Sequence, residues 1–238
     1  KGASKGEGLG NQFLGNIRET DAIIHVLRCF DDGNVVHVDG SVDPVRDKEI
    51  IDTELQLKDL ETVENRIKRV EKIAKVGGDK NAKVEYEVLL AYKAALEEGK
   101  SARSVSFESL EEQKAAKGLF LLTPKPVLYV CNVDEASAAK GNHDVDEVRE
   151  AVKEEGAEVL VLAAQTEADI AELETYEERQ MFLQDVGLEE SGCNRLIKAA
   201  YHMLNLQTFI TAGEMEVKAW TFHKGWKAPQ CAGVIHTD

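Results

Sequence analysis

Several features are scarce or missing in this chain of 238 residues, and each absence excludes a class of protein. No run of about 18 apolar residues occurs, so the sequence predicts no membrane-spanning helix. No signal peptide is visible in the sequence as it stands. We therefore expect a globular, cytoplasmic protein that does not bind membranes and has room for more than one hydrophobic core.

Cysteine is rare, and its spacing argues against crosslinks and metal sites. The four cysteines are far apart, with no CxxC pair: Cys29, Cys131, Cys193 and Cys231. Zinc sites and disulfide frameworks require closer or paired spacings. Two of these residues end apolar runs, so we expect buried free thiols rather than disulfides or metal ligands.

Positive charge is also in short supply. The chain has 29 Lys and Arg residues against 44 Asp and Glu residues, and its formal net charge is −15. Broad affinity for nucleic acid requires clustered cations, so this composition argues against it. A basic face confined to one part of the chain is still compatible with these numbers.

A phosphate-binding loop is missing as well. Such a loop has the form Gly-x-x-x-x-Gly-Lys followed by Ser or Thr, because its backbone N–H groups surround the phosphates. No string of this form occurs in the 238 residues. A protein made only of this chain is therefore expected to bind nucleotide weakly or not at all.

Three apolar runs are present, at 22–29, 127–131 and 158–163, and they predict strands covered on both faces. Between the last two lies a stretch, 145–155, whose valines recur at helical spacing. Strand, helix and strand in this order indicate an α/β fold with a parallel sheet. In such sheets the ligand binds beyond the carboxyl ends of the strands.

The second run ends in Asn132-Val133-Asp134-Glu135. At this place GTPases carry Asn-Lys-x-Asp, whose Asp accepts hydrogen bonds from guanine N1–H and the 2-amino group. Here Val133 takes the Lys position and Glu135 takes the Asp position. The longer carboxylate of Glu135 is expected to crowd the 2-amino group, which adenine lacks, so the change favours ATP over GTP. Taken alone, an Asn-x-x-Glu string at a strand end is usually only a turn.

Residues 43–117 have a helical texture. Asp43-Pro44 predicts a helix start, and apolar residues then recur at the three- and four-residue steps of a coiled coil up to Gly77-Gly78. A second helix in the same rhythm ends at Gly99, which predicts an antiparallel hairpin. Cations gather near its tip, at Lys68, Arg69, Lys72, Lys75, Lys80 and Lys83. They form either a solvated helix face or a surface that binds RNA or a protein partner.

Several segments together resemble the YchF/Obg-like ATPase family. The glycine-rich start, 1–15, is similar to the family's switch II segment, and the similarity continues through 16–30, 129–135, 206–213 and 228–238. The resemblance implies four parts: an NTPase core (1–42), a coiled-coil insertion (43–117), the base-recognition part of the core (118–204) and the start of a β-rich TGS domain (205–238). Family members carry the phosphate loop before the first segment and complete the TGS domain after the last, so this chain is expected to be the middle of a longer protein.

The resemblance also implies a ligand set and a partner. ATP and Mg²⁺ are the expected cofactors, with the metal ligands outside this chain and no metal residue within it. The backbone at Ala163 and Ala164 is the counterpart of a base-contacting Ser-Ala-Lys motif, although the Ser and Lys are absent here. The expected partner is the ribosome or its rRNA.

The group that places the attacking water is open. GTPases often use a switch Gln, but the resembled family carries an apolar residue there. His25, in the first apolar run, is the main candidate, although a lone His within an apolar strand is more often a core packing residue. Gln12 is a weaker alternative.

The sequence therefore predicts an ATP-hydrolysing P-loop protein that associates with ribosomes and regulates translation or stress responses. The alternative is a non-enzymatic nucleotide switch or a ribosome-interaction module.

Overall fold

The computed structural model of the protein describes residues 10–33 and 40–235, with side chains from residue 13 onward. Within these ranges, three parallel strands form the main sheet in the order β1-β2-β3. They are β1 (Ile23–Arg28), β2 (Val127–Asn132) and β3 (Val159–Leu162). The three predicted strands and the parallel α/β fold are confirmed.

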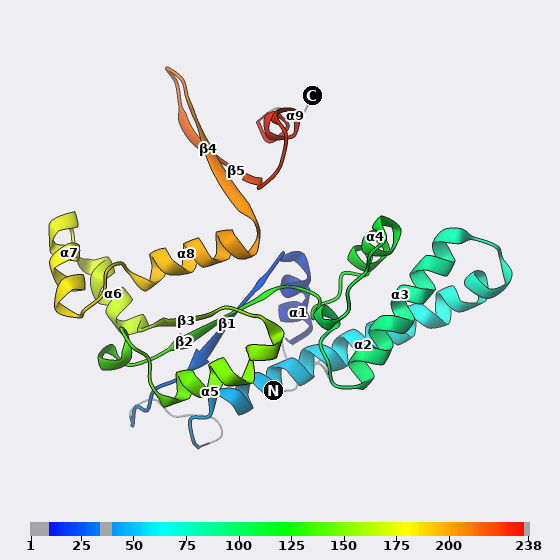
Figure 1. The fold of residues 1–238 in the computed structure, drawn as a ribbon, viewed down its shortest axis with the longest axis horizontal. Coiled ribbons are helices and arrows are strands. Elements are labelled where there is room, and N and C mark those ends of the chain that lie inside the picture. Colours follow the sequence, from blue (N-terminus) through cyan, green and yellow to red (C-terminus); the bar gives the residue numbers. More distant parts are fainter. Residues whose placement is uncertain (1–9, 34–39, 236–238) are drawn as a thin grey trace.

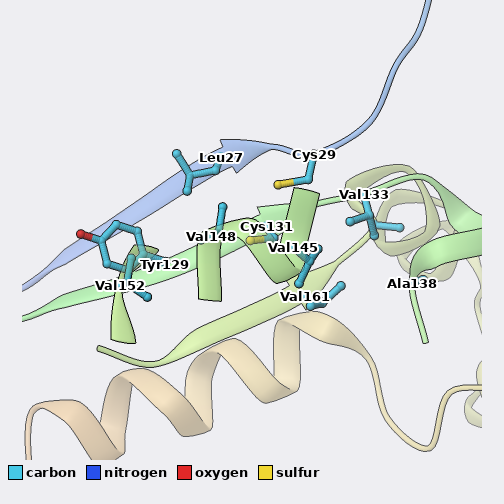
Figure 2. Close-up of a cluster of buried hydrophobic side chains, with 11 residues drawn as sticks. Leu27, Cys29, Tyr129, Cys131, Val133, Ala138, Val145, Val148, Val152 and Val161 are labelled. Atoms are coloured by element: carbon cyan, nitrogen blue, oxygen red, sulfur yellow. The ribbon is translucent and has the colours of Figure 1, made fainter. Parts of the chain in front are cut away.

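Helices cover the two faces of this sheet unequally. Alternate residues of β2 point to opposite faces, so Tyr129 and Cys131 pack against α5 (His143–Ala151), as Figure 2 shows. Leu128 and Val130 pack against α8 (Gly192–Met203) on the other face. On β1, however, the α8 side is open, and Ile24 and Val26 are 45% and 62% exposed. The expectation of a strand covered on both faces is therefore wrong for β1, because α8 lies over β2 and β3 only.

The predicted helical hairpin is present, and we call it the arm. It consists of α2 (Pro44–Val76) and α3 (Lys80–Glu97), which lie side by side and extend away from the sheet (Figure 1). Asp43 caps α2, since its carboxylate accepts a hydrogen bond from the Arg46 backbone N–H. Gly78, at φ +66°, forms the turn between the helices. This left-handed backbone favours glycine.

The arm has its own hydrophobic core. Val63 of α2 packs against Val88, Leu89 and Tyr92 of α3. Val63, Val70 and Ala74 are buried along the apolar repeat of α2.

One buried carboxylate joins the arm to the segment that leads into β2. Asp59 of α2 is fully buried, and it accepts hydrogen bonds from the backbone N–H groups of Leu122 and Thr123 and from the Thr123 hydroxyl. Burial raises the pKa of Asp59, and the three donors oppose that shift. The carboxylate therefore replaces the water that these groups would otherwise bind.

A second set of contacts joins the first turns of α2 to the segment before β3. Lys48 Nζ is 2.7 Å from both Asp52 Oδ2 and Glu155 Oε1. Glu155, in η4 (Lys153–Glu155), also accepts hydrogen bonds from Arg103 of η2 (Ala102–Ser104) and from the Tyr129 hydroxyl. We call Lys48, Asp52, Arg103 and Glu155 the base cluster, because it connects the base of the arm to the sheet.

The carboxyl-terminal part is a separate two-stranded antiparallel sheet. Its strands are β4 (Leu206–Ala212) and β5 (Val217–His223), which confirm the β-type sequence predicted there. The remaining elements are α1 (Gly10–Glu19), α4 (Leu110–Gly118), η3 (Glu135–Ser137), α6 (Ala164–Glu172), α7 (Tyr176–Asp185) and α9 (Ala228–Ala232). None of the helices described is long and apolar enough to cross a lipid bilayer.

The cysteines are free thiols, as expected, but not all of them are buried. Cys29 and Cys131 are buried at neighbouring strand ends, whereas Cys193 is exposed and Cys231 is partly exposed. The expectation of burial is wrong for Cys193 because this residue lies in the first turn of α8, at the surface.

Candidate functional site

The carboxyl ends of the three strands meet at one edge of the main sheet. The register pairs Arg28 with Asn132 and Asn132 with Leu162, so β1, β2 and β3 end side by side. Backbone hydrogen bonds extend this alignment, since Cys29 N donates to Asn132 O and Val133 N donates to Leu162 O. The loops after the strands are therefore held close together.

Asn132 connects two of these loops. Its Oδ1 accepts a hydrogen bond of 2.9 Å from the backbone N–H of Ala164, the first residue of α6. Within the described residues, its Nδ2 has no hydrogen-bond partner in the protein. The structure thus brings three of the predicted site residues together at this edge: Asn132, Ala163 and Ala164.

Val133 and Glu135 differ in their surroundings. Val133 is 4% exposed, and its side chain packs among the core residues below the edge (Figure 2). Glu135 is exposed at the start of η3. Asp134 fixes this turn, because its carboxylate accepts a hydrogen bond from Ser137 N. Of the two predicted base-reading side chains, only Glu135 is free to reach a ligand.

Two further contacts hold this edge in place, and both join segments that are distant in the sequence. Glu167 of α6 accepts hydrogen bonds from the backbone N–H groups of Gly192 and Cys193, which begin α8. Arg195 of α8 donates to Val161 O of β3. The partners lie 25 and 34 residues apart in sequence, so local patterns could not reveal either contact.

His25 lies away from this edge. It stands opposite Tyr129 in the middle of β1, with ring centroids 5.7 Å apart. It lies three positions before Arg28, the last residue of β1, or about 10 Å away along the strand. Burial lowers the pKa of His25 below its ordinary value of 6.5, although nearby Asp52 opposes the shift. Gln12 falls in α1, where its side chain lies outside the described residues, as does the whole glycine-rich segment 1–9.

The arm tip carries exposed cations. Lys75 and Lys80 pair with Glu71 and Glu111. The four remaining cations of the tip are exposed and have no ion-pair partner within the described part of the chain. They are Lys68, Arg69, Lys72 and Lys83. We call these four residues the tip cations. No group of three or more His, Cys, Asp or Glu residues suited to hold a metal ion occurs in the described ranges.

Together these features define an α/β protein whose parallel strands end at one edge of the sheet, the place where such sheets usually bind ligands. Known proteins resemble this chain over its whole length. The chain is 57% identical to the "Ribosome-binding ATPase YchF" of Bacillus subtilis and 54% identical to the protein of that name from Escherichia coli O157:H7. Both alignments cover the whole of this chain but only 65% and 64% of the relatives, so the chain spans slightly less than two thirds of their length.

A solved structure and a family profile also match this chain. The structure of the "Schizosaccharomyces pombe YchF GTPase" matches with a TM-score of 0.84 and 35% identity, over 97% of this chain and 62% of that one. Residues 206–238 match the family YchF-GTPase_C, described as a protein of unknown function (DUF933). The chain belongs to the YchF family.

Proposed function

We propose that the full-length protein to which this chain belongs hydrolyses ATP with Mg²⁺ and associates with ribosomes in the cytoplasm. The observation that carries the proposal is the Asn132–Ala164 hydrogen bond, which joins two loops at the carboxyl edge of the sheet and leaves Asn132 Nδ2 as a donor. The names of the relatives, ribosome-binding ATPases, support the same activity and partner. Bound Mg²⁺ would neutralise charge on the phosphates.

Adenine rather than guanine is the proposed base. The support is Glu135, exposed where a shorter Asp would serve guanine. The other proposed base-site residues are Asn132, Ala163 and Ala164. Val133 takes the position of the GTPase Lys, so the Lys side chain that would lie along a purine is absent here.

The test is competition between ATP and GTP for the full-length protein. Glu135→Asp should move the preference toward GTP by about 1 kcal/mol, as expected for a hydrogen-bonded edge. Glu154→Asp, an exposed glutamate before the amino end of β3, is the matched control. Val133→Lys is a poorer variant because it buries an amine. Equal affinity of the unsubstituted protein for both nucleotides would refute the base assignment.

Hydrolysis itself is tested with radiolabelled ATP, the full-length protein and purified ribosomes. Turnover that depends on the protein supports the ATPase. Ribosome binding without turnover supports the alternative, a nucleotide switch or interaction module.

The arm is proposed as the contact with the ribosome. The tip cations support this, because they concentrate positive charge in a chain whose net charge is −15. rRNA phosphates are the partner that such charges fit, and a protein partner at the coiled-coil arm is the alternative. The antiparallel β4–β5 pair is proposed as the start of the TGS domain.

A catalytic role for His25 stays a prediction. Its position in the middle of β1, against Tyr129, supports the packing alternative. If it places the attacking water, His25→Ala should lower kcat by about 10²-fold at constant nucleotide affinity. If it packs, the melting temperature should fall and kcat per folded molecule should persist.

A further inference from the structure

Glu167 occupies an unusual place between two helices. Its Oε1 is 2.5 Å from Gly192 N, and its Oε2 is 3.0 Å from Cys193 N. Both N–H groups belong to the first turn of α8, where backbone donors lack partners within the helix. A carboxylate is stabilised there, because the amino end of a helix carries partial positive charge. One side chain of α6 therefore caps a helix that begins 25 residues later.

Gly192 makes this close approach possible. A Cβ atom at this position would lie 2.7 Å from Leu162 Cβ and 2.9 Å from Glu167 Oε1. Arg195, one turn further along α8, holds the same strand end through its 2.8 Å hydrogen bond to Val161 O. The start of α8 is thus fixed against the end of β3 from two directions.

The contact reaches the proposed base site in one further step. Glu167 lies one turn after Ala164, so fixing Glu167 fixes the first turn of α6. Ala164 N in turn donates to Asn132 Oδ1. A continuous chain of hydrogen bonds and helix backbone therefore runs from α8 to Asn132.

We propose that Glu167 is a positioning residue for the nucleotide base: it holds α6 so that Ala164 and Asn132 keep the geometry that reads adenine. This inference rests on the proposed ATP site. Glu167 itself touches no ligand. Its loss lets the first turn of α6 shift, and small displacements of recognition groups weaken binding strongly.

The test compares ATP with inorganic tripolyphosphate as ligands of the full-length protein. Tripolyphosphate has no base, so it reports the phosphate site alone. Glu167→Ala should raise the Kd for ATP about tenfold and leave the Kd for tripolyphosphate unchanged, with kcat at saturating ATP within about twofold. Glu167→Gln keeps one acceptor oxygen and should show a smaller loss of the same kind. Glu172→Ala, exposed on the same helix, is the matched control and should change neither constant.

The outcomes separate this inference from the function on which it rests. If the unsubstituted protein prefers ATP over tripolyphosphate and Glu167→Ala keeps that preference, the positioning role alone is overturned. Equal weakening of both ligands would also overturn it, since a general loss of structure acts on both. If the unsubstituted protein shows no preference for ATP, the proposed base site fails and this inference fails with it.

Discussion

The two ends of the arm use the same residue type for different purposes. At the base, Lys48 is buried and contacts two carboxylates at 2.7 Å. At the tip, Lys68, Lys72 and Lys83 are exposed, without ion-pair partners among the described residues. A buried charge must be paired because desolvation is costly, whereas an exposed lysine contributes little to stability. The difference indicates that charge at the base maintains the structure and that charge at the tip is available to a partner.

The largest loss of stability is expected from Asp59, the fully buried carboxylate at the base. Asp59→Ala leaves the N–H groups of Leu122 and Thr123 and the Thr123 hydroxyl without their acceptor. We expect the free energy of unfolding in urea to fall by about 3–5 kcal/mol. Asp134→Ala, which removes an exposed cap, is the control and should cost about 1 kcal/mol. A loss for Asp59→Ala no greater than that of the control would contradict the anchoring role.

A smaller loss is expected from Lys48 in the base cluster. Lys48→Met leaves Asp52 and Glu155 with Arg103 as their remaining shared cation, and we expect a cost of about 2–3 kcal/mol. Burial raises the pKa of Glu155, but the hydrogen bond from Lys48 and nearby cations outweigh it and hold this pKa below its ordinary value of 4.5. Stability from Glu155 is thus present above pH 4.5 and lost as the pH falls further.

The same substitution should therefore also flatten the acid side of the stability profile. Lys153→Met, which breaks an exposed pair with Glu150, is the comparison and should cost less than about 0.5 kcal/mol. Similar costs for the two variants would remove the distinction between base and surface charges.

His25 should make the stability of the protein depend on pH in a range different from that of Glu155. Its folded-state pKa lies below 6.5, so the unfolded chain takes up a proton first as the pH falls. Stability should be complete above pH 6.5 and decline as the pH falls through the lowered pKa. His25→Gln, which cannot titrate, should lose this part of the profile in urea unfolding between pH 7 and 5. The same slope in the variant would assign the effect to another group.

The smallest effect on stability is expected at the tip. Changing Lys68, Arg69, Lys72 and Lys83 to Glu should alter the free energy of unfolding by less than about 0.5 kcal/mol per residue. Cosedimentation of the full-length protein with ribosomes should fall, most clearly at low salt, because phosphate contacts depend on counterion release.

Lys140→Glu with Lys153→Glu reverses two exposed charges outside the arm and serves as the control for the tip. Undiminished cosedimentation of the tip variant would show that the tip cations are solvated surface charges.

Local patterns predicted the framework well. Apolar runs located β1, β2 and β3, and the Gly77-Gly78 pair located the turn of the arm, because both depend on residues close in sequence. The proximity of Asn132 and Ala164 followed from the parallel sheet. The apolar residue Ile197 of α8 is nevertheless 57% exposed, which the local pattern does not reveal.

Contacts between distant segments could not be predicted. Asp59 meets Thr123 across 64 residues, and Glu167 meets Gly192 across 25. In the sequence both acids resemble ordinary charges on helix faces. Their roles depend on backbone N–H groups, which every residue except proline carries and which leave no trace in the amino-acid pattern.

The exposure of Cys193 makes the start of α8 chemically addressable. The thiol lies beside the backbone N–H that Glu167 binds, and partial desolvation of the thiol together with this carboxylate raises the pKa of Cys193. Thiolate is the reactive form toward alkylating reagents, so modification at neutral pH should be slow while the contact is closed. The rate of alkylation at Cys193 should therefore report how often α6 separates from α8. Cys29 and Cys131 are buried, so their alkylation rates report global unfolding in the same sample.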